Sequence, residues 1–63
     1  MDPNQTYLEM FAAMNHKDYT LARERAIELK RWLRRGGFYP LTYSKTEVDA
    51  YLARVLRRTA HLA

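Results

Sequence analysis

The side chains that most often carry out catalysis or bind metals are scarce in this chain. The two histidines, His16 and His61, lie in different segments, and neither has another ligand residue at helical spacing. Cysteine is absent, so the chain has neither a disulfide nor a thiolate ligand. The sequence therefore predicts no metal site.

Glu24 and Glu28 come closest to a catalytic pair, because they lie one helical turn apart. Arg25 and Arg31 adjoin them, which favours a solvated, charge-compensated helix face over paired acid–base chemistry. The only double glycine ends a predicted helix instead of beginning one, so it does not present free helix amides to a phosphate. We therefore expect a protein that is not an enzyme and that binds no cofactor.

Basic side chains gather near the ends of two predicted helices. They are Lys30, Arg31, Arg34 and Arg35 in one cluster and Arg54, Arg57 and Arg58 in the other. The second cluster lies with His61 within an arc of roughly 100° and is the candidate set of contacts to nucleic-acid phosphates. The alternative is that both clusters compensate helix dipoles and cover apolar surface with their stems. If the helices run up-down-up, the clusters lie at opposite poles and do not form one patch.

Length and composition limit which elements could position these residues. The chain has 63 residues, a net charge of +4 and 13% aromatic residues, which predicts one small folded domain. The spacing of apolar residues predicts three helices, at about residues 3–15, 19–35 and 45–60. Asp2, Asp18 and Ser44 stand at the N-cap positions of these helices. The expected fold is all-α, either a three-helix bundle or a helical hairpin with a third helix.

The connector between the second and third predicted helices contains a Gly-Gly-Phe-x-Pro sequence. We expect Gly37 to adopt the left-handed conformation after the helix, with Phe38 packed on Leu33. The connector also carries Leu41 and Tyr43, so we expect it to pack against the bundle and not to extend into solvent.

The apolar stripe of the first predicted helix is broader than one neighbouring helix covers. We expect the third helix and the connector to cover Leu8 and Phe11. The side chains predicted to contact another protein, or a second copy of the chain, are Tyr7, Met10, Met14 and Trp32.

Two resemblances to known families follow from these patterns. Residues 17–29 resemble the start of the second helix of a tetratricopeptide repeat, with matching spacing at Tyr19, Ala22, Ala26 and Leu29. The helix before them departs from the repeat at Thr6 and Met10. This resemblance implies antiparallel helix packing and a protein-binding role.

The second resemblance lies in the connector. Trp32-Leu33, Gly36-Gly37-Phe38 and Pro40 are similar to a motif in a group of short bacterial and phage-encoded helical proteins. This resemblance implies a helical fold and indicates no activity.

The leading hypothesis is a small non-enzymatic helical protein-interaction module that binds another protein or itself, for example as a homodimer. The alternative is a nucleic-acid-associated protein that contacts the phosphate backbone through Arg54, Arg57 and Arg58. No apolar run reaches the length of a membrane span or a signal peptide, so we expect a cytoplasmic protein without membrane contact.

Overall fold

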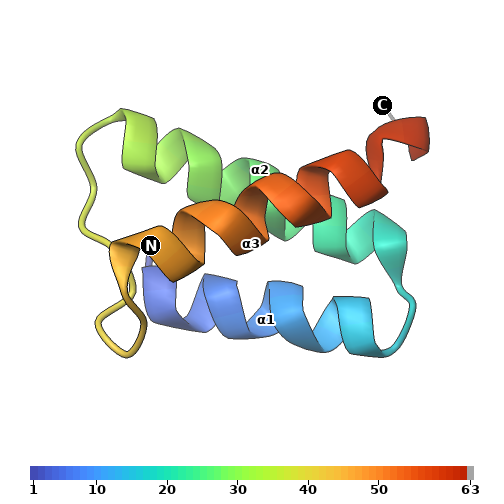
Figure 1. The fold of residues 1–63 in the computed structure, drawn as a ribbon, viewed down its shortest axis with the longest axis horizontal. Helices are drawn as coiled ribbons and strands as arrows, with labels where there is room; N and C mark the ends of the chain where they lie inside the picture. The colour runs from blue at the N-terminus through green and yellow to red at the C-terminus, as the bar shows by residue number, and fades with distance from the viewer. Residues whose placement is uncertain (63) are drawn as a thin grey trace.

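The chain folds into three helices, each of which begins at a capping side chain. The computed structural model describes residues 1–62, with α1 at Pro3–Asn15, α2 at Tyr19–Arg34 and α3 at Lys45–Arg58. A short 3-10 helix, η1, follows at Ala60–Leu62. α1 and α2 are antiparallel and α3 returns alongside both (Figure 1), so the order is up-down-up. The predicted all-α three-helix bundle is confirmed.

The predicted N-cap residues begin the three helices. The side chains of Asp2, Asp18 and Ser44 each accept a hydrogen bond from a backbone amide of the turn that follows, at 2.9, 3.2 and 3.1 Å. Each cap satisfies an amide that has no partner within the helix and contributes about 1 kcal/mol. At their other ends α2 and α3 stop at Arg34 and Arg58, slightly before the predicted residues 35 and 60.

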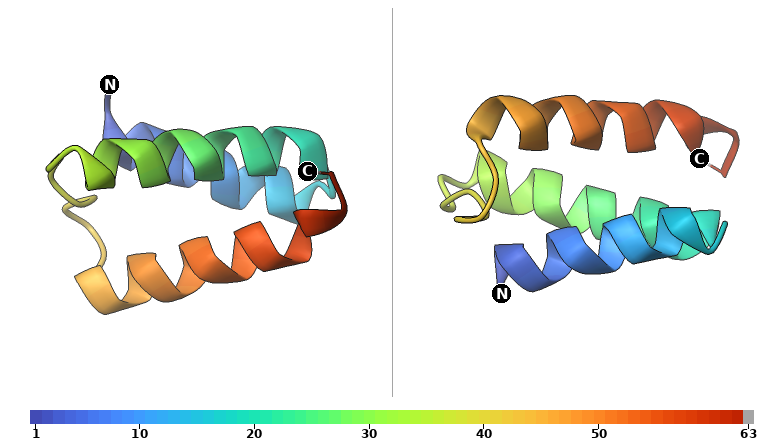
Figure 2. Two further views of the ribbon diagram at one scale, coloured as in Figure 1. Left: turned by 90° about the horizontal axis from the view of Figure 1, so that it is seen from above. Right: turned by 60° about the horizontal axis from the view of Figure 1, so that its bottom comes forward.

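Side-chain size sets the distances between the helices. Ala22 and Ala26 of α2 are fully buried, and such small side chains let α1 and α2 pack closely. α3 lies against α1 across aromatic rings instead. The ring centroid of Tyr7 in α1 lies 5.8 Å from that of Tyr51 in α3 and 4.6 Å from that of Tyr43 in the connector. The right-hand view of Figure 2 looks onto this α1–α3 side, with α2 behind it.

The turn after α2 differs from the prediction by one residue. Gly36, and not Gly37, adopts the left-handed conformation, with a φ of 87°. The amide of Gly36 donates to the Leu33 carbonyl at 3.1 Å, and the amide of Gly37 donates to the Trp32 carbonyl at 2.9 Å, which is the Schellman pattern. Phe38 packs edge-on against Trp32, with ring centroids 5.6 Å apart, whereas Leu33 was the predicted neighbour. The expectation for Gly37 is wrong because the helix ends one residue earlier than assumed.

Arg23 of α2 holds the C-terminal end of α3. Its Nη1 donates hydrogen bonds to the carbonyl oxygens of Leu56 (3.4 Å) and Thr59 (3.3 Å) and to the Thr59 hydroxyl (3.3 Å). The last carbonyls of a helix lack hydrogen-bond donors within the helix and carry partial negative charge. A guanidinium at this position supplies the missing donors and a compensating positive charge. This contact ties the C-terminal end of α3 to the first half of α2.

Candidate protein-interaction surface

Two of the three contact residues predicted on α1 belong to the core. Met10 is fully buried and Tyr7 is 5% exposed. Together with Pro3, Thr6 and Ala13 they form the inward stripe of α1. The prediction that Tyr7 and Met10 form a contact surface is therefore wrong. The broad apolar stripe of α1 offered two faces for burial, and the one that includes the small side chains Thr6 and Ala13 allows closer packing on α2.

The same orientation of α1 exposes the residues that were expected to be covered. Leu8 is 48% exposed and Phe11 is 47% exposed. The Phe11 ring has Tyr51 beside it, with centroids 5.7 Å apart. Leu41 of the connector is 82% exposed, and its amide donates to Asn4 Oδ1 at 2.8 Å, which holds it next to the first turn of α1. Since Asn4 and Leu8 lie one helical turn apart, Leu41 adjoins the same side of α1.

We call this surface the Leu8–Phe11 face, and its members are Leu8, Phe11, Ala12 and Leu41. The one charged residue of α1 is Glu9, which is turned toward α2 and pairs with Arg25 at 2.8 Å. The outward positions of α1 are therefore uncharged, although 29% of the residues in the chain are charged. The centres of protein–protein interfaces are depleted in charge and enriched in aromatic residues. The Leu8–Phe11 face has both properties.

A shallow hollow between α1 and α3 borders this face. It measures ≈ 320 Å³ and is lined by Tyr7, Glu47, Ala50, Tyr51 and Arg54. Burial raises the pKa of Tyr7 and of Tyr51 above the ordinary tyrosine value, so both hydroxyls are neutral at neutral pH. Among the lining residues, charge is therefore confined to Glu47 and Arg54, which lie two helical turns apart on α3.

Trp32 and Met14, the remaining predicted protein contacts, are partly buried. The Trp32 indole donates from Nε1 to the Phe38 carbonyl at 3.0 Å, and the Arg35 guanidinium lies 5.9 Å from its ring centroid. These contacts commit much of Trp32 to the turn after α2. A binding role for Trp32 and Met14 stays a prediction.

The predicted phosphate contacts lie together at the C-terminal end of α3. Arg54, Arg57 and Arg58 line a shallow hollow of ≈ 500 Å³ with Met14 of α1. Arg58 is already engaged, because its Nη2 donates to the Tyr19 hydroxyl at 3.2 Å and its guanidinium carbon lies 4.5 Å from that ring centroid. The other basic cluster lies at the C-terminal end of α2, at the opposite pole of the molecule (Figure 1). The two clusters do not form one patch.

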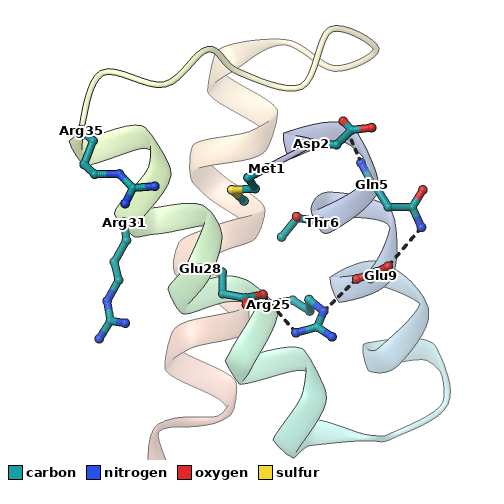
Figure 3. Close-up of a pocket in the computed structure, with 9 residues that line it drawn as sticks. All are labelled: Met1, Asp2, Gln5, Thr6, Glu9, Arg25, Glu28, Arg31 and Arg35. Carbon is teal, nitrogen blue, oxygen red and sulfur yellow. Dashed lines mark hydrogen bonds and ion pairs between the residues drawn. The ribbon is translucent and has the colours of Figure 1, made fainter.

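A polar hollow of ≈ 530 Å³ lies between α1 and α2 (Figure 3). Inside it Arg25 bridges the two helices, with nitrogen–oxygen distances of 2.8 Å to Glu9 and 3.0 Å to Glu28. The hydrogen bond from Gln5, followed by that from Arg25, lowers the pKa of Glu9 below its ordinary value. Glu28 thus lies in a charge-compensated network that joins α1 to α2, and not in a carboxylate pair with Glu24.

Two further findings concern membranes and metals. Within residues 1–62, every helix is too short or too polar to span a bilayer. In the described part of the chain, no group of three or more His, Cys, Asp and Glu side chains is arranged to hold a metal ion.

Comparison with known proteins identifies no relative, since no family model, curated protein or solved structure matches the chain. The two resemblances drawn from the sequence therefore stay predictions.

Proposed function

We propose that this chain is a non-enzymatic helical protein-interaction module that binds its partner through the Leu8–Phe11 face. The observation that carries the proposal is the exposure of Leu8, Phe11 and Leu41 on a side of the molecule where α1 presents no charge. The cytoplasmic location expected from the sequence remains part of this proposal.

A partner that covers the Leu8–Phe11 face gains free energy by burying its apolar side chains. Full burial of a leucine or phenylalanine side chain contributes about 1.5–3 kcal/mol. Because Leu8 and Phe11 are about half exposed and Leu41 is mostly exposed, covering all three contributes on the order of 4 kcal/mol. A partner that covers this face therefore has a substantial driving force before any polar contact is counted.

Photo-crosslinking in cells tests the proposal directly. A photoreactive phenylalanine analogue replaces Ala12, which lies on the Leu8–Phe11 face, or Ala53, an exposed alanine of α3 outside the face. We expect protein adducts from position 12 and few from position 53. Equal adduct yields from both positions would show that the face has no preference for partners.

A paired substitution checks that the adducts depend on the apolar side chains. Leu8→Gln with Phe11→Gln is expected to abolish the adducts while the helical circular dichroism is retained, because both side chains are substantially exposed. Leu62→Gln is the matched control, since Leu62 is 42% exposed and lies in η1, outside the face. Adducts that survive the double substitution would count against this face.

A nucleic-acid-associated function remains the second candidate, supported by the hollow at the end of α3. Its lining combines three arginines with Met14 and includes no carboxylate. Arg57→Glu tests it without removing the Arg58–Tyr19 contact. If phosphates bind there, the affinity for random duplex DNA falls steeply with salt in the original chain and is clearly weakened in this variant.

A further inference from the structure

We infer that the partner of the Leu8–Phe11 face is a second copy of this chain, antiparallel to the first, with Glu47 of each copy paired to Arg54 of the other. This inference rests on the proposed function and specifies its partner. Three features of the α1–α3 side support it: the arrangement of its apolar groups, the arrangement of its charges, and the distribution of net charge.

The apolar groups are arranged so that the Leu8–Phe11 face is self-complementary. Tyr51 contacts both Tyr7 and Phe11, with ring centroids 5.8 and 5.7 Å away, so it lies level with the stretch of α1 that contains Leu8. Consider a twofold axis that lies in the plane of the interface, runs perpendicular to the helices and passes beside Tyr51. Rotation about this axis places α1 of one copy against α1 of the other, and α3 against α3, with each pair of helices antiparallel. Leu8 of each copy then meets Phe11 of the other, as an isologous contact requires.

The charges follow the same symmetry. Glu47 and Arg54 line the same hollow and lie on one side of α3. The midpoint between them falls between Ala50 and Tyr51, which is the level already set by the aromatic contacts. The axis that pairs the apolar groups therefore brings Glu47 opposite the partner's Arg54, twice per dimer. Ala50, small and exposed, lies where the two α3 helices approach each other most closely.

The distribution of net charge favours a second copy over an acidic partner. Each chain carries +4, so two copies repel unless they meet through a surface that lacks this charge. α1 supplies most of that surface, because the last turns of α2 and α3 hold most of the arginines. The arginine that borders the face is Arg54, and in the dimer it lies opposite Glu47 of the other copy. A strongly acidic partner would be drawn mainly to those helix ends, and at this face it would oppose Glu47 with a like charge.

Charge reversal with mixing tests the arrangement. Glu47→Arg and Arg54→Glu are purified separately, and self-association of each is measured by sedimentation equilibrium beside the original chain. Each variant opposes like charges twice in its own dimer, so we expect the dissociation constant to rise about tenfold. An equimolar mixture of the two variants restores both ion pairs, and we expect a heterodimer about as stable as the original dimer.

A control is needed because Glu47 also supports the start of α3. Its Oε1 accepts a hydrogen bond from the Ser44 hydroxyl at 3.0 Å. Glu47→Gln keeps a hydrogen-bonding side chain at this position without the charge, and circular dichroism verifies that every variant is helical. Because the heterodimer contains Glu47→Arg itself, its recovery in the mixture shows that charge pairing and not misfolding weakened the homodimer.

The outcomes separate this inference from the proposed function. A dimer that is weakened in both single variants and recovered in the mixture supports the antiparallel pairing. An original chain that stays monomeric, or a mixture that fails to recover, overturns it. A monomeric chain that still yields crosslinks from position 12 to a different protein overturns the second copy as partner and leaves the proposed function standing.

Discussion

Lys17 adopts an unfavourable backbone conformation in the turn that ends α1. Its φ of 59° lies in the left-handed region, which side chains with a Cβ rarely adopt. The position is imposed by the turn, since the amide of Asp18 donates to the Ala13 carbonyl at 2.8 Å and the amide of Lys17 to the Met14 carbonyl at 3.1 Å. This is the same Schellman pattern that Gly36 completes after α2.

Lys17→Gly should therefore stabilise the protein. Glycine removes the Cβ clash but adds flexibility to the unfolded chain, so we expect a net gain of about 0.5–1 kcal/mol in the free energy of unfolding. Urea denaturation measures it. Lys17→Ala keeps the Cβ and is the control, for which no comparable gain is expected. An equal gain in both variants would mean that the lysine charge, and not the backbone, is responsible.

The two glycines after α2 are needed for different reasons. Gly36 has a positive φ with open space around it, whereas a Cβ on Gly37 would overlap the Trp32 indole. We expect Gly37→Ala to destabilise the fold by about 1–3 kcal/mol through overpacking and to displace the indole. Since Trp32 is the sole tryptophan, its fluorescence reports the displacement. Gly36→Ala should cost about 1 kcal/mol through backbone strain and leave the emission maximum unchanged.

At the scale of the elements, Arg23 holds the C-terminal end of α3 against α2. Exposed basic residues are common in this chain, and no local pattern distinguishes Arg23 from the others. Its role arises because α2 and α3 are antiparallel, which brings an early residue of α2 next to the last carbonyls of α3 (Figure 1).

Removing that guanidinium should loosen the end of α3. Arg23→Met keeps much of the stem but loses the donors, and we expect a cost of about 1–2 kcal/mol, at the lower end for charged hydrogen bonds because the distances are long. Hydrogen exchange should rise in the last turn of α3 more than in α1. Arg31→Met, at an exposed position of α2 without such a contact, is the matched control. A uniform rise across all helices would contradict a local capping role.

For the whole molecule, the up-down-up order keeps the two basic clusters apart. The longest dimension is 27 Å, and the clusters lie toward its opposite ends (Figure 1). Charges separated by more than about 8–10 Å at physiological salt are largely screened from one another. We therefore expect the two basic clusters to contribute independently to the binding of a polyanion.

This independence is measurable on a heparin column. We expect Lys30→Glu and Arg57→Glu each to lower the salt concentration needed for elution, and the double variant to lower it by the sum of the two shifts. Elution that depends on one cluster alone would show that the other takes no part in anion binding. Ala53→Gln, which leaves the charge unchanged, controls for the effect of substitution itself.

Much of the fold could be predicted because its signals are local. Asp2, Asp18 and Ser44 cap the helices they precede, and the apolar spacing gave three helices with boundaries close to those observed. The candidate surface was predicted poorly. Tyr7 and Met10 are core residues, while Leu8 and Phe11 were expected to be covered and are exposed. Periodicity located an apolar stripe on α1 but did not determine which side of it faces inward.

The sequence alone determined where the helices start, roughly where they stop, and that the basic clusters would lie at opposite poles of an up-down-up bundle. These properties depend on residues within a few positions of one another and on helix order. The tertiary structure decided the orientation of α1, the left-handed residue after α2 and the capping role of Arg23. The first and the third depend on packing between distant segments: alanines against α1, and α2 beside the end of α3. The second depends on where α2 ends and on the close approach of the indole to Gly37. The Leu8–Phe11 face arises from the first of them, so the surface proposed for binding emerged only once the helices were packed.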